Sequence, residues 1–302
     1  MRLLVPLIFT LVVSSLSFAN SAYADDAGNR YEQRKLYQKL LHAIKTNQRS
    51  KYHAQKDKLV GYPLYPYLEY TDKIYRISRQ SESSIQSFIG QYADTPLANQ
   101  LLQNWLYTLA KRGDWPTFIN NYNDYRATDT NVCNYAFALY KSGRIKEALD
   151  QAQKLWLVKH SQPDSCDPIF KIWQDEGYLT GEIAWQRYEK ALTANNLTLA
   201  NYLTRFLAKA DRRPANDYTL AHTRPESFLR SNGLKPTDKR STAILLHALK
   251  RSARKDALAA LTSLEANLPL EHAEPNDIAA TYQYIGVRLA RDPKLIDHLI
   301  RI

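Results

Sequence analysis

The chain has 302 residues and a formal net charge of +11, with 41 Lys and Arg against 30 Asp and Glu. Only 9 Gly and 13 Pro occur, and no sustained alternating run of β-branched residues is present, which argues against a sheet protein. The basic residues are scattered and no nucleic-acid-binding motif accompanies them, so nucleic acid is not an expected partner. We therefore predict an all-α protein.

Residues 1–24 are predicted to be a cleaved secretory signal peptide. Arg2 gives a positive start, Leu3–Phe18 is mainly apolar, and Ala22–Ala24 supplies the small-x-small cleavage pattern. A membrane anchor is the alternative, but the apolar run contains a proline and several hydroxyl residues and is short for a membrane span. We expect the mature chain, 25–302, to be exported to the periplasm and to lack a membrane span.

The mature chain is predicted to be a series of short helices separated by brief polar breaks. Its apolar residues recur at the helical period of i, i+3, i+4 and i+7. In Tyr62–Tyr70 two prolines are expected to start a new helix rather than interrupt one. The other predicted helices cover about 25–45, 48–59, 82–92, 96–112, 115–124, 131–142, 145–158, 166–176, 180–194, 197–210, 216–222, 225–232, 238–252, 255–266 and 276–290.

The segment 131–176 contains two predicted amphipathic helices, joined by a tight turn, and both cysteines of the chain. Gly143 lies between the helices, where a left-handed residue would end the first one. Because the chain goes out along one helix and returns along the other, Cys133 and Cys166 should reach the same end of the pair. An even number of cysteines in an oxidising compartment predicts a structural Cys133–Cys166 disulfide. A redox-active or metal-ligating pair is the alternative, but Cys-x-x-Cys spacing and nearby histidines are lacking.

Similar turns recur along the chain. Leu109–Trp115 and Leu139–Ile145 are equivalent turns 30 residues apart, and Leu192–Leu197 and Leu249–Arg254 are weaker copies. Stacked hairpins of this period, like tetratricopeptide repeats, predict a right-handed α-superhelix of short helix hairpins. A globular bundle is the competing interpretation, but it would use fewer and longer helices.

Four short motifs carry a family resemblance. They are Tyr-Pro-Leu-Tyr-Pro-Tyr-Leu-Glu-Tyr at 62–70, Gly-Asp-Trp at 113–115, Cys-Asn-Tyr at 133–135, and Ser-Gln-Pro at 161–163 followed by Cys166-Asp167. In order and approximate spacing they resemble the amino-terminal superhelical domain of soluble lytic murein transglycosylases. The resemblance covers nearly all of the mature chain and is clearest from about 30 to 190. It implies a periplasmic protein whose helices curl into a full or partial ring and whose two cysteines form a disulfide.

Two of the family's catalytic motifs are absent from this chain. Its members cleave the β-1,4 bond between N-acetylmuramic acid and N-acetylglucosamine in peptidoglycan and release 1,6-anhydro-muropeptides. This chemistry belongs to a lysozyme-like domain with a Glu-Ser pair, a Gly-Leu-Met-Gln motif and an Ala-Tyr-Asn motif. The only methionine here is Met1, so Gly-Leu-Met-Gln cannot be present, and Ala-Tyr-Asn is absent too. The resemblance therefore implies the non-catalytic superhelical part, with catalysis requiring a domain carried elsewhere.

Two Glu-Ser pairs do occur, at Glu82-Ser83 and Glu226-Ser227. A catalytic acid needs an apolar, water-poor pocket that raises its pKa. Glu82 lies in a polar run and Glu226 follows Pro225, so both are predicted to lie in the first turn of a helix, where a carboxylate interacts favourably with the helix dipole. We predict no catalytic residue in this chain.

No metal or cofactor site is predicted either. Seven histidines are dispersed without an i, i+4 pair, at positions 42, 53, 160, 222, 247, 272 and 298. The chain has no Gly-rich phosphate loop and no Gly-x-Ser-x-Gly elbow. Aromatic side chains can serve as platforms for sugar rings, but the tryptophans lie mostly on apolar helical stripes and are predicted to pack in the core: Trp105, Trp115, Trp156, Trp173 and Trp185.

Three functional hypotheses follow. The first is a superhelical member of the lytic transglycosylase family that binds peptidoglycan glycan strands, a separate catalytic domain or another cell-wall enzyme. The second is a free-standing periplasmic scaffold that binds proteins through a concave face. The third is an active glycosidase that uses an unrecognised carboxylate. We favour the first, because it accounts for the motifs that are present and for the catalytic motifs that are missing.

Overall fold

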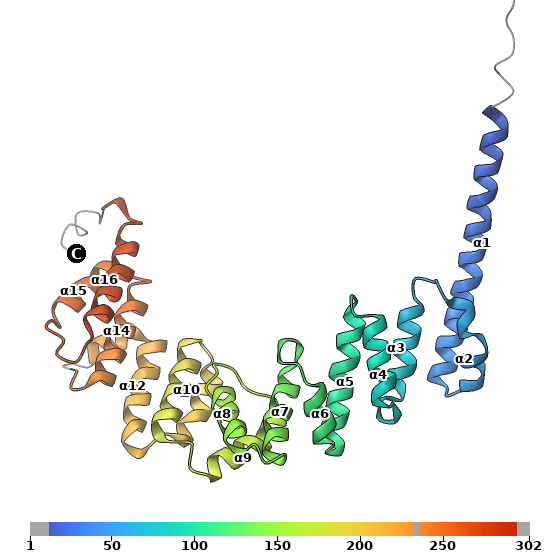
Figure 1. The fold of residues 1–302 in the computed structure, drawn as a ribbon. Coiled ribbons are helices and arrows are strands. Elements are labelled where there is room, and N and C mark those ends of the chain that lie inside the picture. Colours follow the sequence, from blue (N-terminus) through green and yellow to red (C-terminus); the bar gives the residue numbers. More distant parts are fainter. Residues whose placement is uncertain (1–11, 232–235, 295–302) are drawn as a thin grey trace, which may run out of the picture. The chain divides into compact units, whose positions relative to one another are not determined.

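The computed structural model describes residues 12–231 and 236–294, and every regular element within these ranges is a helix (Figure 1). The prediction of an all-α superhelical fold is confirmed. The chain forms two compact units, Met1–Ile145 and Lys146–Ile302.

The helices follow one another closely along the chain. The first unit contains α1 (Val12–Lys45), α2 (Arg49–Gln55), α3 (Tyr65–Tyr75), α4 (Glu82–Gln91), α5 (Pro96–Arg112), α6 (Trp115–Asn121) and α7 (Asp129–Lys141). The second contains α8 (Ile145–Trp156, from its second residue), α9 (Asp167–Asp175), α10 (Gly181–Thr193), α11 (Leu197–Leu203), α12 (Arg212–Thr223), α13 (Pro225–Ser231), α14 (Lys239–Ser252), α15 (Ala257–Glu265) and α16 (Pro275–Leu289).

Several helix bounds differ from the prediction: α12 begins at Arg212 rather than at 216, and the predicted helix 48–59 is α2 followed by a 3₁₀ turn. Within the described residues α1 already includes Val12, well before the predicted start at Asp25, because residues 12–24 contain no Pro or Gly that would end a helix. The predicted helix 197–210 stops at Leu203 and continues as two 3₁₀ turns, because Leu207 and Ala208 adopt extended backbone angles.

The predicted signal peptide is only partly covered by the structure. Residues 1–11 lie outside the described residues, so cleavage after Ala24 stays a prediction. Among the residues that are described, none of the helices has the length and apolar character needed to cross a membrane.

In the first unit, α5 is the central helix, since it contacts α3, α4, α6 and α7. Thr95 precedes it and Pro96 occupies its first position, where the missing N–H of proline does no harm. Leu101, Trp105 and Leu109 then recur at four-residue intervals and are fully buried. The helix therefore forms because its apolar stripe is covered on several sides.

In three of the four recurring turns, a residue in the left-handed backbone conformation ends the preceding helix. Gly113 follows α5 with φ 73°, and Gly143 follows α7 with φ 79°, as the sequence predicted for Gly143. Asn195 takes the same role after α10, with φ 66°. The fourth turn differs, because Ala253 after α14 has an ordinary right-handed conformation. Gly or Asn is required in the first three turns because other residues rarely adopt a positive φ.

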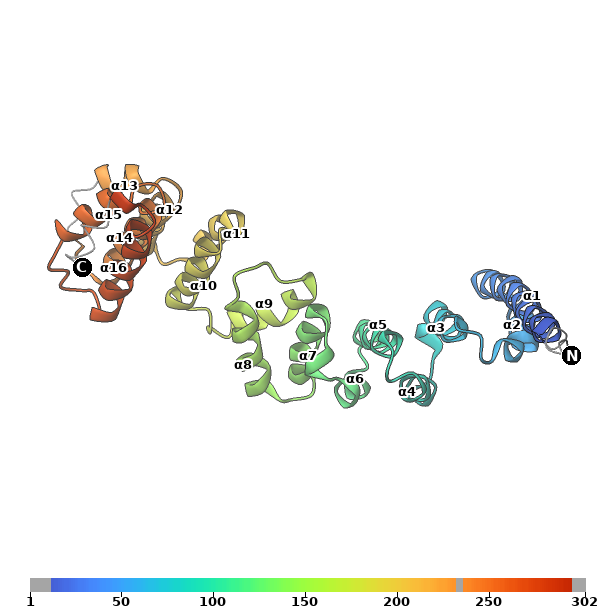
Figure 2. The same cartoon turned by 90° about the horizontal axis from the view of Figure 1, so that it is seen from above.

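In the second unit, α14 packs against α12, α13, α15 and α16, and both views show α14, α15 and α16 side by side (Figures 1 and 2). α14 begins with a capping box in which Asp238 accepts from the Ser241 N–H and Ser241 reaches back to the Asp238 N–H. Leu245 and Leu249 on α14 share an apolar core with Ile285 on α16.

The tryptophans pack as the sequence predicts. Trp105, Trp156, Trp173 and Trp185 are buried, and Trp115 is half-buried. In the second unit, the ring of Trp156 packs edge-on against Phe170 and Phe206, with centroid distances of 5.3 and 5.4 Å. This cluster joins α8 to α9 and to the turn after α11.

Both cysteines are fully buried, Cys133 in α7 and Cys166 at the start of α9. Neither is a free thiol. The Cys133–Cys166 pairing itself stays a prediction. It would close a loop of about 30 residues and contribute about 3.7 kcal/mol on the chain-entropy model.

Peptide mapping of the oxidised protein should therefore find one cross-linked peptide pair containing Cys133 and Cys166. Reduction should lower the free energy of unfolding by about 3.7 kcal/mol in urea denaturation. The Cys133→Ala/Cys166→Ala variant is the control, since a reductant should leave its unfolding curve unchanged. Two alkylatable thiols in the untreated protein would refute the pairing.

Candidate functional site

The two Glu-Ser pairs lie at helix starts, as the sequence predicts. Glu82 is exposed in the first turn of α4, where the Ser81 hydroxyl caps the Ser84 N–H at 3.2 Å. The Glu82 carboxylate accepts from the Asn121 amide at 2.7 Å. Glu226 lies in the first turn of α13 and is half-buried. In these positions the carboxylates support local helix geometry.

The tyrosine–proline motif builds a half-buried hydrogen-bonded cluster around Glu69, a role that the sequence motifs did not reveal. Tyr92 donates to one carboxylate oxygen at 2.5 Å, and Tyr65 donates to the other at 3.4 Å. Lys56 Nζ lies 3.9 Å from Glu69. Burial and the Glu69 charge raise the pKa of Tyr65 to about 12. The cluster ties α3 to the end of α4, which gives the motif a structural role.

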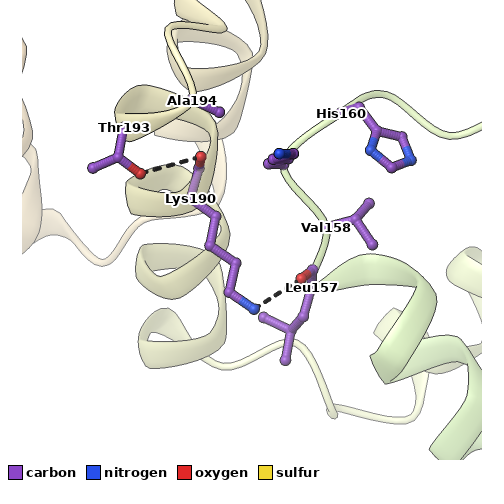
Figure 3. A pocket seen from close by; sticks show the side chains of 7 residues that line it. Leu157, Val158, His160, Lys190, Thr193 and Ala194 are labelled. Carbon is purple, nitrogen blue, oxygen red and sulfur yellow. Dashed lines mark hydrogen bonds between the residues drawn. The ribbon is translucent and has the colours of Figure 1, made fainter.

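The second unit contains a groove between the segment 157–160 and α10 (Figure 3). Three side chains from α10 and the turn after it hold this segment by its carbonyl oxygens. Lys190 Nζ donates to Leu157 at 3.0 Å, Arg187 to His160 at 3.3 Å, and Asn196 to Lys159 at 3.4 Å. Leu157 N–H still donates to the Gln153 carbonyl of α8 at 3.0 Å, and beyond it these three contacts bind the segment to α10 and the turn that follows.

The groove is lined by both basic and apolar side chains. Its volume is about 550 Å³, and it is lined by Leu157, Val158, Lys159, His160, Lys190, Thr193 and Ala194. Figure 3 shows Lys190 reaching across to Leu157, while His160 lies on the opposite wall. No carboxyl group is among the lining residues, so the groove can bind a ligand but cannot supply the paired carboxylates of glycoside hydrolysis.

Arg187 lies behind this groove and is 4% exposed. Its guanidinium stacks over the Trp156 ring, 4.3 Å from the ring centroid. Burial lowers the pKa of Arg187 to about 10, and its Nε has no hydrogen-bond partner in the described residues. The cation–π contact and the His160 carbonyl therefore stabilise the guanidinium charge, a role that a carboxylate usually has.

The structure brings together two histidines that the sequence separates by 25 residues. His222 Nδ1 lies 3.0 Å from His247 Nε2, and the other nitrogen of His222 lies 2.9 Å from the Asn195 side-chain oxygen. The Tyr218 ring packs edge-on against His247. These residues join α12 and α14 to the turn after α10.

Both histidines are held neutral. Burial, followed by the charges of Arg251 and Arg254, lowers the pKa of His222 to about 4. Burial lowers the pKa of His247 to about 3, helped by His222 and the nearby Lys250, Arg251 and Arg254. Sequence spacing alone could not reveal this pair, because the contact depends on how α12 packs on α14. Within 12–231 and 236–294, no group of three potential ligands is placed to hold a metal ion.

Comparison with known proteins identifies relatives of this chain. No family model matches it. The chain is 30% identical over 220 residues to the soluble lytic murein transglycosylase of Escherichia coli strain K12. This match covers 73% of the chain and 32% of the relative, so the chain spans about a third of the curated relative's length.

Two solved structures are similar over most of the chain. An inactive mutant of the lytic transglycosylase Slt from Pseudomonas aeruginosa aligns with a TM-score of 0.77 and 30% identity, covering 86% of this chain and 42% of that one. The 70 kDa soluble lytic transglycosylase from Escherichia coli aligns with a TM-score of 0.68 and 25% identity, covering 89% and 44%. In both cases the similarity lies in the all-α superhelical domain.

The buried histidine pair should make the second unit sensitive to acid. Because folding lowers both pKa values below 6.5, the stability is fully present above about pH 6.5 and is lost as the pH falls toward 4. Each histidine that protonates only on unfolding should contribute about 1.4 kcal/mol per pH unit in this window. Urea denaturation of His247→Gln should show a shallower pH dependence than the wild type.

His272→Gln is the matched control, because it removes an exposed histidine from the same unit without touching this network. Equal pH slopes for the wild type and His247→Gln would contradict the assignment.

Arg187 should stabilise the second unit through its stacked, buried stem. Arg187→Ala removes the contact with Trp156 and leaves a cavity, so the free energy of unfolding should fall by about 2–3 kcal/mol. Arg187→Met keeps most of the volume and should lose less. Chemical denaturation measures both variants, and an equal loss for the two would show that packing of the stem is not the main contribution.

Proposed function

Because the chain is related to soluble lytic murein transglycosylases through their superhelical domain, we propose that it is a non-catalytic, peptidoglycan-binding protein of the periplasm. The observation that carries this proposal is the similarity in sequence and fold over most of the chain. The name of these relatives states that they act on murein. For this chain we propose binding to the same polymer, either alone or together with a separate cleaving domain.

The chemistry of the α10 groove supports this proposal. Peptidoglycan strands consist of sugar rings whose lactyl groups carry either a free carboxylate or an amide-linked stem peptide with carboxylates of its own. The basic lining residues Lys159, His160 and Lys190 would attract these carboxylates, and the apolar lining residues would contact sugar or peptide carbon atoms. A net charge of +11 favours approach to an anionic polymer in the same way, and added salt would weaken this attraction.

The positions of the Glu-Ser pairs support a non-catalytic role. Glu82 is exposed and hydrogen-bonded to Asn121, which is unlike the water-poor setting that a general acid needs. Neither Glu82 nor Glu226 lines the groove. Cleavage would then be the task of another domain or enzyme.

A protein-binding scaffold is the second candidate, and one observation favours it. The loop before α3 and the start of that helix expose three large apolar side chains, with Val60 66%, Leu64 41% and Tyr67 50% exposed. Clustered exposed apolar residues are typical of protein-binding surfaces. In this case a cell-wall enzyme, rather than the glycan, would be the ligand.

Sedimentation with purified sacculi tests the proposal. The full chain should bind sacculi at low salt, and the variant Lys159→Gln/Lys190→Gln should bind about tenfold more weakly if two charge-assisted contacts are lost. The control, Lys146→Gln/Lys171→Gln, removes two exposed lysines from the same unit and should bind nearly as well as the wild type.

The muropeptides in the same samples should remain unchanged after prolonged incubation. Release of 1,6-anhydro-muropeptides would refute the non-catalytic role and would indicate a glycosidase with an unrecognised carboxylate. Absence of sacculus binding, together with capture of an envelope enzyme that is lost on Val60→Ser/Tyr67→Ser substitution, would favour the scaffold.

A further inference from the structure

A second pocket lies at one end of α14, α15 and α16, and its charge is not balanced. It has a volume of about 470 Å³ and is lined by Ala253, Arg254, Lys255, Asp256, Ala257, Arg288, Arg291 and Asp292. Four of these side chains are cationic and two are anionic, which leaves a formal charge of +2. The pocket is separate from the α10 groove, and the proposed function does not use it.

Two of the guanidinium groups are held in place by a single tyrosine. Arg254 Nε donates to the Tyr284 hydroxyl at 3.1 Å. Arg288 stacks on the Tyr284 ring, 3.5 Å from its centroid, and donates one Nη to the Tyr284 carbonyl at 3.0 Å. Each guanidinium has five N–H donors, so both keep several for a ligand. Holding the groups in advance lowers the entropy lost when a ligand binds.

The two carboxylates of the pocket accept hydrogen bonds from backbone N–H groups. Asp256 caps α15 by accepting from the Ala259 N–H at 2.9 Å. Asp292 accepts from the Lys294 N–H at 3.0 Å. Within the part of the chain that the structure describes, neither forms an ion pair with the four cationic residues. The two carboxylates offset only part of the positive charge, and the pocket keeps an excess of two cationic groups.

The surroundings increase this positive potential. The N-terminus of α15, a helix of nine residues, opens at Ala257 on the pocket wall, where the Asp256 cap offsets part of the positive end of its dipole. Arg251 lies nearby, and burial together with the charge of Arg254 lowers the pKa of Arg251. Like charges held this close repel one another, and an anion would relieve the repulsion.

We propose that this pocket binds a phosphate group, coordinated by Arg254 and Arg288 and attracted by Lys255 and Arg291. Two guanidinium groups beside a helix N-terminus suit a tetrahedral oxyanion with several charged oxygens, whereas a single carboxylate would occupy only one guanidinium. The phosphate is either that of a soluble phosphate compound or that of an anionic lipid headgroup.

Titration of inorganic pyrophosphate into the full chain, followed by calorimetry at low salt, tests the pocket. Saturable binding should occur, and Arg254→Gln/Arg288→Gln should weaken it about tenfold or more. Because these residues also contact Tyr284, the exposed pair Lys255→Gln/Arg291→Gln serves as a second variant and should weaken binding without altering thermal unfolding.

The matched control is Arg212→Gln/Arg213→Gln, which removes two exposed positive charges from α12 in the same unit. It should bind pyrophosphate almost as well as the wild type. Absence of saturable binding, or equal affinities for the control and both pocket variants, would overturn the proposal.

Vesicles distinguish the two sources of phosphate. Sedimentation with phosphatidylglycerol vesicles, but not with phosphatidylcholine vesicles, that is lost in the pocket variants and displaced by pyrophosphate would support a lipid headgroup. Pyrophosphate binding without vesicle binding would support a soluble phosphate compound. Vesicle binding that is equal in the pocket and control variants, without saturable pyrophosphate binding, would be diffuse charge attraction and would overturn the proposal.

Discussion

The fold depends on the burial of one apolar stripe per helix against its neighbours. Isolated helices shorter than about 12–15 residues are marginal in water. Most helices here are within or below that length, such as α6 with seven residues and α15 with nine. Each is stable only because an adjacent helix covers its apolar side, as α5 does for α6 and α14 does for α15. The stack is therefore cooperative between neighbours, in the manner of repeat proteins.

This local dependence explains what the sequence could predict. The helical period of apolar residues and the turns with Gly113 and Gly143 are short-range signals, and they located nearly every helix. The end of α11 at Leu203 was not predicted, because no Pro or Gly marks the extended backbone at Leu207 and Ala208. Short-range patterns therefore predict the order of the elements well and their interruptions less well.

The sites were harder to predict because they depend on contacts between distant residues. The bond between Tyr92 and Glu69 joins residues 23 positions apart, and the His222–His247 pair spans 25. The groove needs α10 to hold a segment whose path has no pattern in the sequence. By contrast, the placement of Glu82 and Glu226 in the first turns of helices could be predicted, because it follows from neighbouring residues alone.

The apolar stripes also limit how the chain can change in evolution. An α-helix turns by about 100° per residue, so one residue inserted in the middle of α5 would rotate the part of the helix that follows by about that angle. Leu109 would then leave the side of the helix on which Leu101 and Trp105 are buried. Substitutions on the exposed faces carry no such penalty. Descendants of this chain can thus replace most of their surface residues and remain superimposable, provided that the lengths of the helices stay the same.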